Sequence, residues 1–200
     1  GTSLLALAVN PMTGDLWVAN TDARNRTRFE PAIAGRAFDN RVTVVTGNAS
    51  DHGNGFHVPL EPPLTSRSHA QPAALAFHDD GHGGGIAYIA ALGTATVVAL
   101  DAVTGELVAE IDTGEVPVGL AVDDENHRLY VLSRVDKDVR TYDIAGGHAL
   151  AARPQPLAYD TEPQGVDRGR RHLYDARAST GAGNGNMSCA SCHIFGHTDA

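Results

Sequence analysis

Residues 119–133 read GLAVDDENHRLYVLS, and this stretch decides the fold. A short apolar run is followed by a polar turn and by a second apolar run that carries one aromatic residue, Tyr130. Two apolar runs of strand length around a polar turn are typical of a β-hairpin. The same pattern occurs around Trp17 in residues 5–20 and around Tyr88 in residues 74–90. The sequence therefore predicts a repeated hairpin unit.

The second and third copies of this unit continue into further strand-like runs, residues 96–101 and 138–143. Pro72 and Pro117, which precede these copies, lie 45 residues apart, close to the period of a four-stranded propeller blade. Two long loops lengthen the first unit, and a strand over residues 41–46 lies between them. The predicted fold class is all-β, with a partial β-propeller of about three to four four-stranded blades.

The segments WVAN (17–20) and YIAA (88–91) resemble the signature strand of the YVTN-type β-propeller repeats of bacterial extracytoplasmic proteins. This resemblance implies a propeller domain over residues 1–155. Three to four blades do not close a ring, and an open ring presents unpaired strand edges. We therefore expect a second chain, or sequence missing from this chain, to complete the propeller.

Composition excludes two classes of partner. The chain has 24 acidic and 15 basic side chains, for a formal net charge of −9, and Lys137 is its single lysine. It offers no polycationic stretch, so nucleic-acid binding is not expected. No apolar run is long enough for a membrane span. The arginines of the first long loop, Arg24, Arg26 and Arg28, form a candidate docking patch.

Residues 189–193 read CASCH and contain both cysteines of the chain. The strand pattern stops before them, which predicts a linker over residues 156–168 and a second domain over residues 169–200. In a Cys-x-x-Cys-His segment the two sulfurs lie on one side of a helical turn and can bond covalently to haem, while the histidine binds the iron. Cys189 and Cys192 are thus the candidate thioether anchors, and His193 is the candidate axial ligand.

Three other uses of these residues compete with haem. A disulfide between Cys189 and Cys192 would close a very small loop and add little stability. A thioredoxin-like redox pair is expected within a βαβ unit, which does not surround this segment. A zinc ion could take Cys189, Cys192, His193 and His197, although structural zinc sites usually draw their second ligand pair from a distant segment.

The segments GRRHLYDARAS (169–179) and SCASCHIFGHTD (188–199) together resemble the first haem domain of the di-haem cytochrome c peroxidase superfamily. The resemblance implies the start of a small α-helical cytochrome c-type domain with one haem c, and a second haem outside this chain. A sixth iron ligand within the chain would come from His52, His57, His69 or His148, because His197 would lie on the same side of the haem as His193.

The function expected from this resemblance is that of a c-type cytochrome: covalent haem binding and electron transfer, as part of a peroxidase-like oxidoreductase carried on the propeller. Its partner would be a small electron-transfer protein, a cytochrome or a cupredoxin. The location would be periplasmic or extracellular in a bacterium, because c-type haem is attached outside the cytoplasm. The alternative is a non-enzymatic propeller interaction module with a zinc-stapled Cys/His tail.

Overall fold

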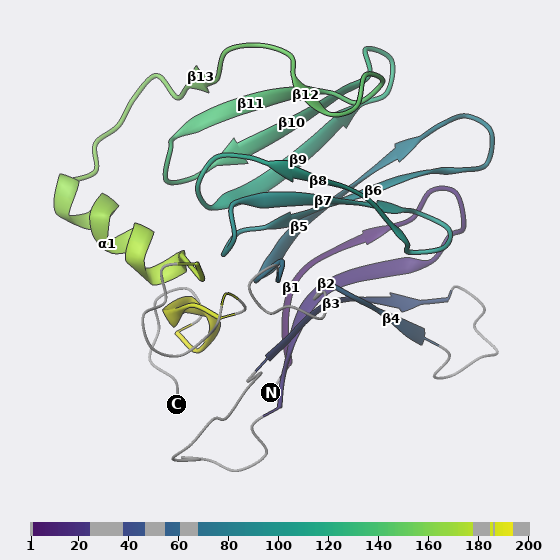
Figure 1. Ribbon diagram of the computed structural model, residues 1–200, viewed down its shortest axis with the longest axis horizontal. Coiled ribbons are helices and arrows are strands. Elements are labelled where there is room, and N and C mark those ends of the chain that lie inside the picture. Colours follow the sequence, from purple (N-terminus) through teal and green to yellow (C-terminus); the bar gives the residue numbers. More distant parts are fainter. Residues whose placement is uncertain are drawn as a thin grey trace.

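The computed structural model describes residues 2–24, 38–46, 55–60, 68–177, 185 and 187–193. It confirms the predicted fold class, because the described residues form three antiparallel sheets that follow one another along the chain (Figure 1). Each sheet is one propeller blade, and its strands are hydrogen-bonded mainly in the order in which they occur in the sequence. A single α-helix and one 3₁₀ turn follow the sheets in the described part of the chain.

The three blades have the following strands. The first blade contains β1 (Thr2–Val9), β2 (Leu16–Ala23), β3 (Phe38–Val45) and β4 (Gly55–Pro59). The second blade contains β5 (Pro72–Asp79), β6 (Gly85–Ala91), β7 (Thr96–Asp101) and β8 (Leu107–Asp112). The third blade contains β9 (Pro117–Asp123), β10 (Arg128–Ser133), β11 (Asp138–Asp143) and two short strands, β12 (Ala149–Leu150) and β13 (Gln155–Pro156), which both pair with β11.

The residues that precede β5 and β9 show that the second and third blades are structural repeats. Gln71 and Val116 both have φ of +58°, a left-handed conformation that side-chain-bearing residues seldom adopt. The carbonyl of each accepts a backbone hydrogen bond from the residue after the neighbouring strand. The N–H of Leu92 donates to Gln71 at 3.1 Å, and the N–H of Arg134 donates to Val116 at 3.0 Å. One backbone geometry therefore occurs at matching positions of both blades.

The core lies between the blades. Alternate residues of each strand point to opposite faces of a sheet, so an apolar alternation buries one face. Trp17, Val42 and Val44 of the first blade pack against Ile89 and Val98 of the second. The other face of the second blade forms a different cluster with the third blade: Tyr88, Val97, Ala99, Leu129, Val131 and Tyr142. The second blade is thus packed on both sides.

The chain leaves the blades through residues 157–163 and enters helix α1 (Gln164–Tyr174), which begins inside the stretch expected as a linker, 156–168. The 3₁₀ turn η2 (Cys189–Ser191) lies beside α1, at the same end of the molecule (Figure 1). The first strands of the blades, β1, β5 and β9, are neighbours. Helix α1 and the turn η2, together called the tail, lie near one end of the first strands, which are the inner strands of the blades.

Replacing Leu129 with alanine tests the packing between the second and third blades. The Leu129 side chain is fully buried, so Leu129→Ala removes apolar contacts and leaves a cavity; we expect a loss of about 2–5 kcal/mol in the free energy of unfolding. The exposed Leu107 is the control, since Leu107→Ala should change this free energy by no more than about 0.5 kcal/mol. Urea denaturation of both variants measures the difference, and equal midpoints would contradict the blade packing.

Candidate functional site

The candidate site is the Cys-His turn, residues 187–193. Its 3₁₀ turn is closed by local hydrogen bonds: the N–H of Cys192 and that of His193 both donate to the carbonyl of Cys189, at 3.2 and 2.9 Å. Serine is well suited to cap such a turn, because its short side chain bonds nearby backbone groups. Here the N–H of Ser188 donates to Oγ of Ser191 at 3.1 Å. Residues 188–193 thus form a turn that is closed by their own hydrogen bonds.

The turn has a buried side and an exposed side. Met187, Ser188, Ala190 and Ser191 are each no more than 7% exposed. Cys189, Cys192 and His193 are exposed, and both cysteines are thiols rather than a disulfide. The two residues between the cysteines therefore anchor the turn, while the candidate haem-binding side chains are accessible.

Gln71 holds the turn to the propeller. Its side-chain Nε2 donates to Oγ of Ser188 at 2.9 Å and to Oγ of Ser191 at 2.8 Å. The Gln71 side chain is buried, and its backbone N–H donates to Oδ1 of Asn40 in the first blade at 2.9 Å. One residue therefore joins the first blade, the second blade and the Cys-His turn.

Two further contacts position the tail. Met187 packs against Ala23 of β2. The N–H of Ala176 donates to the carbonyl of Gly93 at 2.8 Å. A Cβ atom at Gly93 would lie 3.1 Å from the Cβ of Ala70 and 3.2 Å from that of Ala176, which is tighter than ordinary van der Waals contact. Glycine at position 93 thus allows the segment after α1 to approach the second blade closely.

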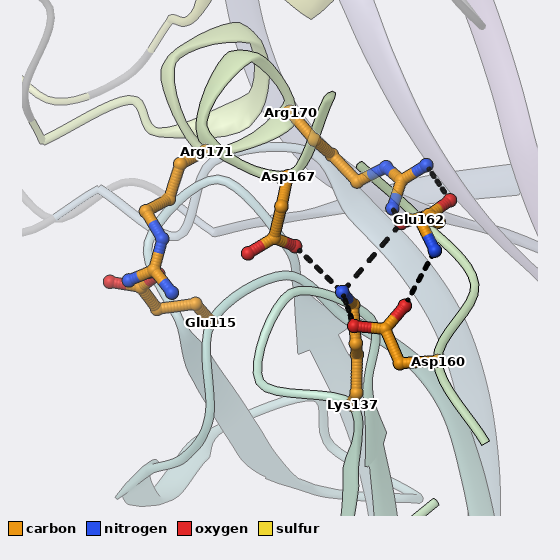
Figure 2. Close-up of polar contacts among 7 residues, drawn as sticks. All are labelled: Glu115, Lys137, Asp160, Glu162, Asp167, Arg170 and Arg171. Carbon is orange, nitrogen blue, oxygen red and sulfur yellow. Dashed lines mark hydrogen bonds and ion pairs between the residues drawn. The ribbon is translucent and has the colours of Figure 1, made fainter. Parts of the chain in front are cut away.

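Helix α1 is attached to the third blade by a group of ion pairs around Lys137 (Figure 2). The Lys137 ammonium lies 2.5 Å from the carboxylate of Asp160, 3.2 Å from that of Asp167 and 3.9 Å from that of Glu162. Asp167 belongs to α1, whereas Asp160 and Glu162 belong to the segment that leads into it. The single lysine of the chain thus fixes both the segment and the helix.

Two arginines of α1 complete the ion-pair group. Arg170 pairs through two nitrogens with both carboxylate oxygens of Glu162, and Arg171 lies 2.6 Å from the carboxylate of Glu115, before β9 (Figure 2). The hydrogen bond from Lys137 holds the pKa of Asp160 below its ordinary value, and that from Arg170 does the same for the pKa of Glu162. The hydrogen bond to Asp160 raises the pKa of Lys137.

The histidines considered as a sixth iron ligand are placed in the blades. His69 is buried; its Nδ1 lies 3.3 Å from Oγ1 of Thr96 and its Nε2 lies 3.2 Å from the carboxylate of Glu110. Burial lowers the pKa of His69, as it does that of His148, whose Nε2 lies 3.0 Å from the Tyr88 hydroxyl. Neither ring nitrogen of His69 is open to a metal. Nδ1 of the exposed His57 lies 3.1 Å from Oγ1 of Thr43, and His52 and His197 lie outside the described residues.

The remaining sequence predictions have different outcomes. Arg24 of the candidate docking patch forms an ion pair with Asp39 at 2.5 Å, and Arg26 and Arg28 lie outside the described residues. Across the ranges that the structure describes, no three histidine, cysteine, aspartate or glutamate side chains gather closely enough to hold a metal ion. No helix in the described part of the chain is long and apolar enough to cross a membrane.

Sequence reasoning missed Gln71, although a signal was present. The two repeats begin Gln71-Pro72 and Val116-Pro117, so a polar residue replaces an apolar one at the same position. Lys137 was noted only as the single lysine. Its partners Asp160 and Glu162 lie in a stretch without hydrophobic periodicity, from which no contact could be predicted.

The fold and the site together define a partial β-propeller that carries a Cys-x-x-Cys-His turn at one end of its blades. No protein-family profile matches the chain. No curated protein matches it either.

Solved structures support the propeller fold. The chain is similar to hydrazine synthase from Kuenenia stuttgartiensis, with 19% identity and a TM-score of 0.57 over 70% of this chain and 45% of that one. It is also similar to a protein of unknown function from Bacteroides caccae, with 13% identity and a TM-score of 0.53 over 81% and 49%. A streptogramin B lyase matches with 16% identity and a TM-score of 0.51 over 78% and 41%. The alignments therefore span less than half the length of these structures, and at such identities they show the fold alone.

Replacing Gln71 with leucine tests the attachment of the turn. Gln71→Leu removes two hydrogen bonds worth about 0.5–1.5 kcal/mol each, so the backbone amides of residues 191–193 should exchange with solvent roughly tenfold faster. Hydrogen exchange measured by mass spectrometry reports this change. Gln155→Leu, at an exposed position of the third blade, should leave the same amides unchanged. Equal exchange in both variants would contradict the clamp.

Acidification and loss of Lys137 should release helix α1. The lowered pKa values of Asp160 and Glu162 mean that these carboxylates stabilise the docked state above their ordinary values of 3.8 and 4.5 and lose this effect as pH falls through the lowered values. Because the pKa of Lys137 is raised, the contribution of this lysine to docking stays constant up to pH 10.5, the ordinary pKa of a lysine. We therefore expect amide exchange in residues 160–177, corrected for its intrinsic pH dependence, to be flat between pH 5 and 10 and to rise below about pH 4.

Lys137→Met should raise the same exchange at neutral pH, by less than about tenfold because exposed ion pairs are weak, and added salt should raise it in the wild type. Arg168→Met is the control, at an exposed position of the same helix. A wild-type exchange rate that does not respond to salt would argue against ion-pair docking.

Proposed function

We propose that the chain is a c-type cytochrome, in which Cys189 and Cys192 anchor one haem covalently and His193 binds its iron. The observation that carries the proposal is the split of the Cys-His turn: Ala190 and Ser191 face the propeller, while the thiols and the imidazole are exposed. A planar group bound by both sulfurs would occupy the exposed side of the turn. The two residues between the cysteines must then face the other way, as Ala190 and Ser191 do.

The residues fit a haem better than a zinc ion. A zinc site brings four ligands to one point in a tetrahedron. In the part of the chain that the structure describes, no three metal-binding side chains gather in this way, and His197, the fourth ligand of the zinc alternative, lies outside it. Two thioether bonds and one iron bond require instead that the three side chains reach different atoms of a large planar group.

The attachment chemistry needs no leaving group. When a haem is bound, the thiols of Cys189 and Cys192 would each add across one of its vinyl groups: the S–H bond and the vinyl double bond would be lost, and one carbon–sulfur bond and one carbon–hydrogen bond would form. The iron of such a haem would supply a one-electron couple between its ferrous and ferric states. Gln71 keeps the turn in place on the propeller, and the ion-pair group around Lys137 attaches helix α1.

Further parts of the proposal rest on the resemblance to di-haem peroxidases. They are a peroxidase-like oxidoreductase activity, a second haem outside this chain, a small cytochrome or cupredoxin as electron partner, and a periplasmic or extracellular location.

A separate proposal concerns the propeller, because strand β1 has an exposed apolar face. Leu4, Leu7 and Val9 are 70%, 69% and 61% exposed, and we propose that a further blade with an apolar face covers them.

The test is the intact mass of the full chain, denatured after expression in a host that attaches c-type haem, together with its reduced visible spectrum. We expect the polypeptide plus one haem in the wild type and the bare polypeptide in a Cys189→Ser, Cys192→Ser double variant. His193→Ala should alter the spectrum or abolish attachment, whereas His82→Ala, at an exposed loop position, should change neither.

A bare wild-type mass would overturn the haem proposal. If one equivalent of zinc accompanied it, the result would favour the alternative, an interaction module with a stapled tail. If haem is attached, a change of its spectrum on addition of hydrogen peroxide would support the peroxidase-like activity, and an unchanged spectrum would favour an electron carrier.

A further inference from the structure

A cavity of about 220 Å³ lies where the Cys-His turn meets the propeller. Its walls include Leu5 of β1, Ala73 of β5 and Val118 of β9, one residue from the inner strand of each blade. Tyr174, the last residue of α1, and Ala190 of the turn contribute to its lining from the tail. A single water molecule needs only about 10–15 Å³ of such space, so this cavity has room for a small organic molecule.

Two polar side chains of the cavity, Gln71 and Arg134, stand where the second and third blades differ. Gln71 and Val116 occupy matching positions of the second and third blades, and so do Leu92 and Arg134; all four line the cavity. The backbone hydrogen bond at each pair is the same whichever side chain is present. The backbone of the blades therefore does not require a glutamine at position 71 or an arginine at position 134.

The charge beside the cavity is opposite in sign to the net charge of the chain. Arg134 is the only charged residue among those described around it, and it is exposed. The chain as a whole has a formal net charge of −9. A positive group beside an apolar cavity attracts anions to that place.

The Gln71 amide has an unused acceptor. Its Nε2 is committed to Ser188 and Ser191, while its Oε1 is buried and has no hydrogen-bond partner among the described residues. Burying such an oxygen without a donor is unfavourable. A ligand that brought an O–H or N–H group to this amide would supply the missing partner.

We propose that this cavity binds a small organic anion with an apolar body, whose anionic group lies at Arg134 and whose hydrogen-bond donor lies at the Gln71 amide. The site goes beyond haem attachment and does not depend on it, because Cys189, Cys192 and His193 are not among the residues described around the cavity. Its occupant would touch the buried back of the Cys-His turn, through Ala190 and Ser191, and leave the exposed thiols untouched.

The test measures the binding of 4-hydroxybenzoate, used as the probe, to the full chain. Titration calorimetry and ligand-detected NMR report this binding. A ligand of about ten non-hydrogen atoms should bind with a Kd on the order of 1 mM. Benzoate, which lacks the donor, and 4-hydroxybenzamide, which lacks the charge, should both bind more weakly.

Three variants locate the binding. Arg134→Gln should weaken 4-hydroxybenzoate about three- to fivefold, as expected for an exposed charge pair, and should leave 4-hydroxybenzamide unchanged. Val118→Phe should abolish binding of both by filling the cavity, with circular dichroism confirming that the variant is folded. Arg128→Gln is the control, since Arg128 begins β10 at the opposite end from Arg134 and should have no effect.

Absence of binding to the wild type at several times the expected Kd would overturn the proposal. So would equal binding by the wild type, Arg134→Gln and Val118→Phe, because the probe would then bind elsewhere. If Arg134→Gln weakened the acid and the amide equally, the proposed charge contact would be wrong. If Val118→Phe did not fold, the comparison of acid and amide on Arg134→Gln would still decide.

Discussion

The arrangement of this molecule depends on the buried amide of Gln71. The backbone of this residue takes part in the hydrogen bonding of the first two blades, and its side chain bonds the two serines of the Cys-His turn. Hydrogen bonds in a buried place are difficult to exchange for bonds to water, so the turn and the blades are held as one unit. The orientation of Cys189, Cys192 and His193 follows from this contact, because the serines that flank and separate the cysteines face inward.

The ion pairs around Lys137 act differently from the Gln71 clamp. They are partly exposed, and such pairs contribute little individually and weaken as salt is added. Together, however, they attach both helix α1 and the segment that leads into it to the third blade. The tail is therefore held at two places by two kinds of force, a buried neutral contact at the turn and an exposed charged contact at the helix.

Much of the fold could be predicted because it is periodic. The hairpins around Trp17, Tyr88 and Tyr130 were evident from apolar runs and polar turns, and the prolines 45 residues apart begin β5 and β9 as the repeat required. The start of α1 could not be placed, since Gln164 follows a polar stretch without a clear N-cap side chain. The candidate cysteines and histidine were found from their spacing. Gln71 was not, because its partners lie more than a hundred residues away, beyond the reach of any local pattern.

The side chains that contact the tail or line the cavity stand at positions where the second and third blades differ. Gln71 stands where the third blade has Val116, and Arg134 stands where the second blade has Leu92. Lys137 stands where the second blade has Ala95, and both residues have a positive φ. The carbonyl of each accepts a backbone hydrogen bond from the residue just after the last strand of its blade, β8 or β13. All three departures lie toward the end of the blades that meets the tail. A repeat fixes the backbone at such positions, so each side chain is available for another purpose, and here the three serve the turn, the cavity and the helix. Differences between the repeats thus locate the proposed sites of this protein better than the repeats themselves.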